Sequence, residues 1–385
     1  MRIENVKIFT MNDNRDIIER GYVEIEGSKI VSVGPFEGEG EVTKVLYPGL
    51  IDAHTHVGII GDALGFESDD VNETGDPLTP HLRALDAINP FDRCFSDARA
   101  AGITTVAVAP GSANPIGGQI CVVKTVGRRI DDMAILSPAA VKFALGENPK
   151  GCYHSKSQMP ETRMATAAMM REMLTKAKKY AEDMDAAHTA PSNPDEEAPD
   201  EPDFDIKLES LIPVIKGEIP CHFHCHRADD ICTAIRIAKE FNLKYVLVHC
   251  TEGSLIADIL ASEGACAIVG PNLTDRSKPE LLNQTYKNPA LLAKEGVKIA
   301  ITTDHSVTPI NYLSLCASLA KQSGLPYMDA LSAITCNAAD ILGISGRTGS
   351  IECGKDADLV LMSGDIFDLN TKIECVWIDG VQCGS

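Results

Sequence analysis

The sequence predicts an α/β protein: a TIM-like (β/α)8 barrel joined to a small β-sandwich domain that is built from both ends of the chain. The chain has 385 residues, 44% of them hydrophobic, and this exceeds the roughly 250 residues of a bare barrel. In the middle of the chain, short strand-like runs alternate with helical stretches. Both ends of the chain have a different sequence pattern, which predicts short strands separated by turns. One barrel with a smaller appended unit fits these three observations.

The terminal segments are expected to fold together. The first contains VKIFTM, YVEIEG and KIVSVG, separated by Asn, Asp and Gly turn signals. After Gly346 the chain continues through ADLVLMSG and IECVWIDGVQ. Because chain ends often lie close together in space, we expect residues 1–47 and 346–385 to form the β-sandwich domain, and residues 48–345 to form the barrel.

In the middle of the chain, strands and helices are expected to alternate, as is typical of a parallel sheet. Helical stretches intervene, as in residues 228–241, where Ile231, Ile235 and Ala238 recur on one face. Residues 182–205 interrupt this alternation, because they are rich in acidic residues and prolines, so we expect a mobile surface loop there. The clearest strands are TTVAVAP (104–110), AAVKFAL (139–145), IPCHFHCH (219–226), YVLVHC (245–250), CAIVGP (266–271) and VKIAITTD (297–304).

Composition limits the partners and the compartment. A formal net charge of −20 argues against nucleic acid, whose phosphates need a basic surface. No run of about 18 apolar residues and no N-terminal cleavage signal is present, so we expect a cytoplasmic protein with no membrane contact. The thirteen cysteines are scattered through apolar segments, which favours buried free thiols. A soft-metal site at Cys221 and Cys225 is the weaker alternative.

Histidines gather at the expected strand ends. In a parallel barrel all strand carboxyl ends open on one face, so side chains distant in sequence converge there. A single histidine on a strand is more often a core residue, but four clusters at four strand ends indicate a metal site. The clusters hold seven of the ten histidines: His54 and His56; His222, His224 and His226; His249; and His305 beside Asp304.

His54 and His56 are separated by one residue, a spacing that allows both side chains to bind the same metal ion. Side chains alternate across a strand, so both imidazoles point to the same side. They can therefore bind one ion at the ~2.0 Å typical of zinc–nitrogen bonds. Two further histidines and an aspartate from other strands would complete a site of nitrogen and carboxylate ligands, which suits zinc or another first-row divalent metal.

Several segments together resemble the amidohydrolase superfamily over nearly the whole chain. The HxH pair on the expected fifth strand is similar to that of the imidazolonepropionase-like and prolidase-like branch. Residues 141–145, VKFAL, resemble the fourth-strand segment of isoaspartyl dipeptidase, where a carboxylated lysine bridges two metals. The segments that carry the superfamily resemblance are PGLIDAHTH (48–56), VHC (248–250), TTDH (302–305), GSI (349–351) and GKDADLV (354–360).

The resemblance implies a hydrolase that cleaves an amide-type C–N bond, linear or cyclic, of a small-molecule substrate with metal-activated water. It implies one or two divalent metal ions, zinc above all, and a homo-oligomer. Asp304 would bind the more buried metal and take the proton from the attacking water, whose pKa can fall to about 7 on a metal. The remaining implied roles are His54 and His56 on the buried metal, His224 and His249 on the more exposed one, and His226 at the substrate.

The bridging position has two candidates. A lysine inside a barrel is unfavourable unless its charge is removed or paired, and carboxylation of Lys142 by carbon dioxide would do this and supply two oxygens. Glu147, just beyond the strand end, could instead take the bridging position or leave a single-metal site. If Lys142 does neither, it forms a structural ion pair.

Arg163, which follows the fourth expected strand, is a candidate to bind a substrate carboxylate, although a single loop residue is usually solvated. Two other functions compete with hydrolysis of an amide. One is deamination of a heterocycle, which needs similar ligands and usually one metal. The other is a non-catalytic barrel that acts in assembly; such relatives tend to lose metal ligands, whereas the full candidate set is present here.

Overall fold

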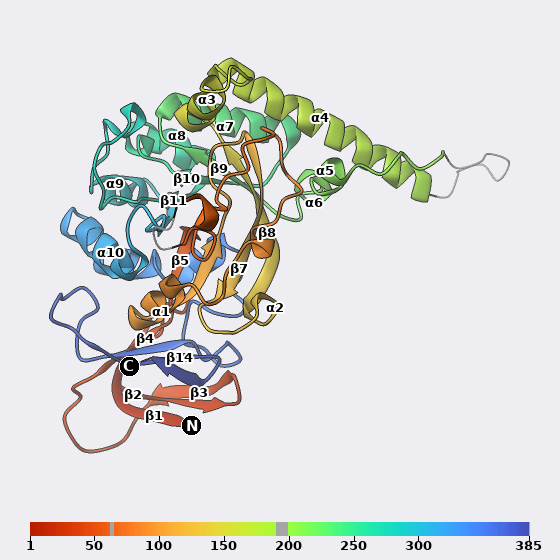
Figure 1. The fold of residues 1–385 in the computed structure, drawn as a ribbon. Helices are drawn as coiled ribbons and strands as arrows, with labels where there is room; N and C mark the ends of the chain where they lie inside the picture. The colour runs from red at the N-terminus through yellow and green to blue at the C-terminus, as the bar shows by residue number, and fades with distance from the viewer. Residues whose placement is uncertain (62–64, 190–198, 385) are drawn as a thin grey trace.

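The structure is a computed structural model that describes residues 1–61, 65–189 and 199–384. Eight strands form one sheet in the order β12-β11-β10-β9-β8-β7-β6-β5, and β12 returns to β5, so the sheet nearly closes. This confirms the expected barrel (Figure 1). Its strands are β5 (Leu50–Thr55), β6 (Ile103–Val108), β7 (Ile116–Lys124), β8 (Ala134–Ala144), β9 (Cys221–Cys225), β10 (Tyr245–His249), β11 (Cys266–Val269) and β12 (Lys298–Ile301).

One barrel strand departs from the expected parallel arrangement. β7 pairs antiparallel with both β6 and β8, whereas the other pairs in the barrel sheet are parallel. Only residues 109–115 separate β6 from β7, and so short a connection turns the chain straight back, while a parallel crossover needs a dozen residues or more. The glycine-rich segment 109–119 therefore contains this turn and the start of β7.

Helices cover the outside of the barrel. α7 buries Ile231, Ile235 and Ala238 against it, as the helical periodicity predicted, and ends at Asn242 in the left-handed conformation (φ 54°). The helices are α1 (Arg93–Ala100), α2 (Ile130–Met133), α3 (Glu147–His154), α4 (Arg163–His188), α5 (Ile206–Glu209), α6 (Ile212–Ile215), α7 (Ala228–Phe241), α8 (Ala257–Ser262), α9 (Asn288–Lys294), α10 (Leu313–Gln322), α11 (Tyr327–Ser332) and α12 (Cys336–Ile341). Short 3-10 turns lie at Phe66–Ser68, Ala84–Asp86, Gly253–Ile256, Pro279–Leu281 and Ile310–Tyr312.

Both chain ends build a second sheet, which lies below the barrel in Figure 1. Its seven strands are hydrogen-bonded in one continuous sheet, in the order β15-β14-β13-β4-β1-β2-β3. The sheet has its own hydrophobic core, with Val23 and Ile25 from the first part of the chain and Leu359 and Trp377 from the last. The strands are β1 (Arg2–Phe9), β2 (Ile17–Glu26), β3 (Lys29–Pro35), β4 (Val45–Pro48), β13 (Leu359–Met362), β14 (Ile373–Ile378) and β15 (Val381–Gly384).

A buried ion network joins the two sheets. Lys124, at the end of β7, is 2% exposed and its ammonium contacts three carboxylates of the terminal unit. Its Nζ lies 3.1 Å from Asp356 Oδ2 and 3.3 Å from Asp379 Oδ1, and it also donates to the buried Asp358. Asp356 accepts further from Lys29. Lys124, Asp356 and Asp358 are thus buried charges that compensate one another, with Lys29 and Asp379 at the edge of the network.

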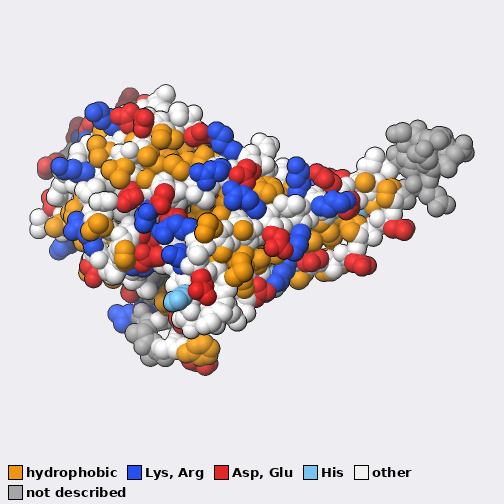
Figure 2. All heavy atoms as spheres, turned by 90° about the horizontal axis from the view of Figure 1, so that it is seen from above, with side chains coloured by type: hydrophobic (Ala, Val, Ile, Leu, Met, Phe, Trp, Pro, Cys, Tyr) orange, Lys and Arg blue, Asp and Glu red, His pale blue; other side chains and the backbone are white. Residues whose placement is uncertain are grey.

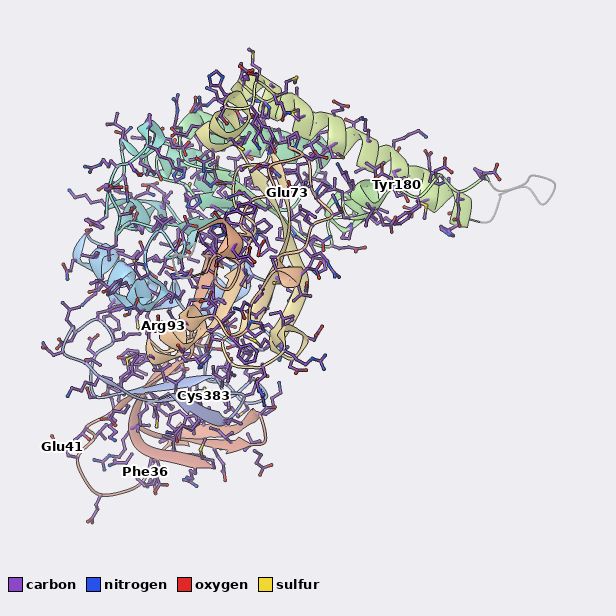
Figure 3. All side chains as sticks on the ribbon, viewed as in Figure 1. Phe36, Glu41, Glu73, Arg93, Tyr180 and Cys383 are labelled. Carbon is purple, nitrogen blue, oxygen red and sulfur yellow. The ribbon has the colours of Figure 1, made fainter. Side chains whose placement is uncertain are left out.

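The helix α4 extends away from the barrel as an arm (Figures 1 and 2). Tyr180, labelled in Figure 3, faces the short helices beneath the arm and donates to Glu209 Oε2 (3.1 Å). α4 runs to His188, so residues 182–188 of the expected loop are helical; residues 190–198 of that loop lie outside the described part of the chain. None of the helices within the described ranges has both the length and the apolar character needed to cross a membrane.

Candidate metal centre

The carboxyl ends of the parallel barrel strands enclose a cavity of about 210 Å³. β4 of the terminal sheet leads directly into β5, so these strands start next to that sheet and end on the far side. The loop after β5, marked by Glu73 in Figure 3, contributes to the rim. The cavity is lined by His56, Val71, Asn72, Gly111, Ser112, Lys142, Asn148, His224, His226, His249, Pro271, Thr274, Ser277, Lys278, Leu281, Asp304 and Val307.

His54, His56 and Asp304 form a first group of side chains that can hold a metal ion. Asp304 Oδ1 lies 3.5 Å from His54 Nε2 and 3.4 Å from His56 Nε2. Two ligand atoms that each lie about 2.0–2.1 Å from a tetrahedral ion are about 3.3–3.5 Å apart. Both separations from Asp304 Oδ1 therefore match those between two ligands of one ion, and all three ligand atoms lie within 4.8 Å of one another.

His224, His226 and His249 form a second group, whose ligand atoms all lie within 4.8 Å of one another. The ring of His249 stacks on that of His226 at 4.6 Å between centroids, and its centroid lies 4.5 Å from that of His224. The two groups lie next to each other, because the ring centroids of His54 and His249 are 5.6 Å apart. The structure thus brings His226 into a group of candidate ligands, beside the substrate role that the sequence suggested.

Hydrogen bonds at Nδ1 orient several of these rings. His56 Nδ1 lies 2.7 Å from the carbonyl oxygen of Ala109, and His249 Nδ1 lies 2.7 Å from that of Gly270. Because a carbonyl only accepts, each Nδ1 carries the proton and each Nε2 keeps its lone pair for a cation. Metal-binding histidines typically have this second partner.

Burial keeps four of the candidate histidine ligands neutral. Desolvation lowers the pKa of His54, His224 and His226 well below the ordinary value. Burial also lowers the pKa of His249 to about 4. Neutral imidazole is the form that binds metal, so near pH 7 no proton has to leave these rings first.

Several buried polar atoms at the centre have no hydrogen-bond partner within the described residues. They include Asp304 Oδ1, Glu280 Oε1 and the Nδ1 atoms of His54 and His224. Unsatisfied buried polar groups are rare in native proteins and indicate a bound water, an ion or a functional role. A divalent cation suits the two carboxylate oxygens, so the residues present fit a metal centre.

Lys142 lies on β8 beside the first group. It is 1% exposed, and its Nζ is 3.0 Å from His54 Nε2. Burial lowers the pKa of Lys142 to about 8, which increases the share of the neutral amine that can react with carbon dioxide. The position therefore suits either a neutral amine or a carboxylated one.

Glu147 and Arg163 do not line the cavity of the histidines. Glu147 is half-buried at the start of α3 and its Oε2 accepts from the backbone nitrogen of Glu280 (3.2 Å). Arg163 Nε donates to both carboxylate oxygens of Asp230, at 2.9 and 3.1 Å. Both side chains line a separate surface hollow next to Lys150.

The structure adds polar residues that the sequence did not single out. Asn148 Nδ2 donates to Ser112 Oγ (2.7 Å), and Lys278 Nζ donates to Asn148 Oδ1 (2.8 Å), all at the cavity wall. Glu280 is fully buried near His226, and burial raises the pKa of Glu280 to about 6. These residues come from loops and from the start of α3 and carry no recognisable motif, so only their convergence in the fold reveals them.

Asp52 fixes the two strands that carry the first group. Its Oδ1 accepts from Thr302 Oγ1 (2.6 Å), and its Oδ2 accepts from both the nitrogen and Oγ1 of Thr303 (3.0 and 2.6 Å). The carboxylate thus connects β5, two residues before His54, with the segment that leads to Asp304. The backbone at Asp304 is left-handed (φ 52°), a conformation that is sparsely populated outside glycine and is often retained at functional sites.

The chain is similar in sequence and in structure to known proteins. Residues 45–383 match the sequence profile described as the amidohydrolase family. The structure resembles that of an amidohydrolase from Thermotoga maritima MSB8, with a TM-score of 0.93 and 39% identity over 99% of this chain and 98% of that one.

Curated relatives carry several enzyme names. Amidohydrolase tasK of Hapsidospora irregularis is 28% identical over 94% of this chain, which spans 39% of the length of tasK. A 5-methylthioadenosine/S-adenosylhomocysteine deaminase of Bacillus cereus (strain AH820) is 26% identical, over 92% of this chain and 83% of the relative. An imidazolonepropionase of Streptococcus pyogenes serotype M4 is 22% identical, over 91% and 86%.

Proposed function

Because this chain belongs to the amidohydrolase family, whose members act on C–N bonds, we propose that it is a metal-dependent hydrolase of an amide-type C–N bond, linear or cyclic, in a small molecule. The observation that carries the proposal is the pair of adjoining ligand groups at the strand ends, inside one cavity. A cavity of about 210 Å³ suits a small substrate or one end of a larger one.

The proposed ligands follow from these groups. His54, His56 and Asp304 would hold the more buried ion, and His224 and His249 the more exposed one. Nitrogen and carboxylate ligands in near-tetrahedral spacing favour zinc. A carboxylated Lys142 would bridge the two ions; the support for this role is its burial beside His54 and its lowered pKa.

The chemistry can be assigned to the chain's own side chains. When bound, the metal supplies a water of lowered pKa and polarises the scissile carbonyl. Asp304 Oδ1 faces the two histidines, which leaves Oδ2 to accept the proton of the attacking water and return it to the leaving nitrogen. Asn148 and Lys278, linked at 2.8 Å, offer polar contacts to the substrate at the cavity wall.

Deamination of a heterocycle is the second candidate. It is favoured by the similarity to the deaminase of Bacillus cereus over most of both chains. The two reactions differ in the leaving nitrogen: deamination releases ammonia from a ring, whereas hydrolysis of a cyclic amide opens it. The same proton transfer through Asp304 serves either reaction.

A substrate panel with defined metal content tests the proposal. Metal-free protein is loaded with Zn²⁺ and assayed against N-acyl amino acids, dipeptides, cyclic ureides, cyclic imides and 5-methylthioadenosine. We expect turnover of at least one class, lost on chelation and in the His54→Ala/His56→Ala variant. His188→Ala, at the exposed end of α4, is the matched control and should behave as wild type. Absence of metal-dependent turnover across the panel would contradict the proposal.

A further inference from the structure

We propose that Glu280 is a metal ligand that joins His224, His226 and His249, so that the second group becomes a site with four protein ligands. The inference deepens the proposed function, because it specifies how the more exposed ion would be held. Glu280 lies in the 3-10 turn Pro279–Leu281, which follows β11. No sequence motif marks this turn as part of a metal site.

The free oxygen of Glu280 is aimed at the histidines. Its Oε1 lies 3.6 Å from His226 Nε2 and 3.9 Å from His224 Nε2. These separations are close to the roughly 3.3–3.5 Å between two ligands of one tetrahedral ion. The side chain is fully buried, and within the described residues Oε1 has no hydrogen-bond partner.

The other oxygen is anchored so that this orientation is fixed. Glu280 Oε2 accepts from the backbone nitrogen of Glu147 (3.1 Å), while Glu147 Oε2 accepts from the backbone nitrogen of Glu280 (3.2 Å). Gly146 leaves the necessary room, because a Cβ at that position would come within 2.7 Å of Glu280 Oε2. Two loops are thus shaped around a buried carboxylate.

Lys278 forms a long ion pair with this carboxylate but no hydrogen bond. Its Nζ is 3.8 Å from Glu280 Oε1, beyond hydrogen-bond distance, and it donates instead to Asn148 Oδ1 at 2.8 Å. A buried carboxylate oxygen without a hydrogen-bond donor is unfavourable. A divalent cation bound to the neighbouring imidazoles would neutralise its negative charge. The resulting set of three histidines and one glutamate has four ligands whether or not Lys142 is carboxylated.

Titration of metal-free protein with Co²⁺, monitored by absorption and by competition with a chelator, tests the inference without any substrate. We expect two equivalents in wild type. Glu280→Gln keeps the shape but weakens the ligand, so one equivalent should lose affinity at least about 10–100-fold, the loss that mutating an outer-shell partner of a metal ligand already causes. The affinity of the other equivalent should not change.

Glu263→Gln is the matched control, because it removes the same charge from a glutamate that pairs with Lys239 on the outside of the barrel (2.9 Å). It should leave both affinities unchanged. Unchanged affinities in Glu280→Gln would overturn the inference alone, and wild type that binds no Co²⁺ would overturn the proposed function with it. If Glu280→Gln fails to fold, a structure of metal-loaded wild type decides. An ion within about 2.0–2.2 Å of Glu280 Oε1 supports the inference, and an ion on the histidines without this contact overturns it.

Discussion

Asp304 meets two demands at once, because one of its oxygens faces His54 and His56 while the second remains available for a proton. Asparagine keeps the size of the side chain and one oxygen but cannot accept the proton. Asp304→Asn should therefore lower kcat by about 10²–10⁴-fold, the usual contribution of general acid–base catalysis. Thermal stability and much of the metal content should be retained.

The competing interpretation is that Asp304 only binds metal, with His226 or His305 moving the proton. Turnover, metal content and Tm measured on the same preparation of Asp304→Asn separate the two. Near-normal turnover at full metal occupancy would exclude the proton-transfer role.

Burial of His249 predicts a pH dependence of stability in the metal-free protein. Its pKa is lowered to about 4 in the folded state, against about 6.5 in an unfolded chain. Between these values the unfolded state binds more protons, so the free energy of unfolding rises with pH and is lost as pH falls from about 6.5 to about 4. Urea unfolding between pH 4 and 7 should show this slope, and His249→Gln should reduce it. An equal slope in both proteins would contradict the assignment.

At the scale of elements, Asp52 connects β5 with the end of β12, the two segments that carry the first ligand group. Asp52→Ala removes the acceptor of the Thr302 hydroxyl and of two donors on Thr303. Because buried donors left without a partner are unfavourable, the free energy of unfolding should fall by about 3 kcal/mol. Chemical denaturation measures the loss, and Asp13→Ala, an exposed aspartate in the turn before β2, should change little. Equal stability of the two variants would show that the Asp52 contacts are dispensable.

A strand or helix of this fold could be predicted from the sequence only where its own residues form a recognisable local pattern. The strands that carry His54, His224 and His249 are buried on both faces. Their short runs alternate with helical stretches, as is typical of a parallel barrel, so the common end of these strands could be predicted. β7 could not, because the glycines at its start resemble a turn and only its pairing with β6 and β8 makes it a strand.

Loop residues are harder to assign than strand residues. Glu147 follows the strand of Lys142 directly, so sequence proximity suggested a bridging role, yet its side chain faces the turn of Glu280. Glu280 itself is more than fifty residues from His224 and comes close to it only because two segments distant in sequence pack together. Their packing involves Gly146 and two hydrogen bonds from backbone nitrogens to glutamate side chains, which no sequence periodicity encodes.

At the scale of the whole molecule, the barrel and the sheet of both chain ends meet at a buried network of charges. Asp356 and Asp358 belong to the segment GKDADLV that carries part of the family resemblance. Their contacts give this segment a physical role, since both carboxylates accept from Lys124 of the barrel. We propose on this basis that residues 1–47 and 346–385 form one unit that is held to the barrel by Lys124.

Replacement of Lys124 tests how strongly the network holds the two parts together. Lys124→Met keeps a similar length but leaves Asp358, which is 3% exposed, without its cation. Removing one partner of a buried ion pair typically destabilises by about 3–5 kcal/mol, so denaturant unfolding should show a loss of this size. Lys29→Met is the matched control, because Lys29 is 47% exposed and Asp356 keeps Lys124 and Arg347. That variant should lose at most about 1 kcal/mol. Equal losses in the two variants would mean that the buried network does not hold the terminal sheet to the barrel.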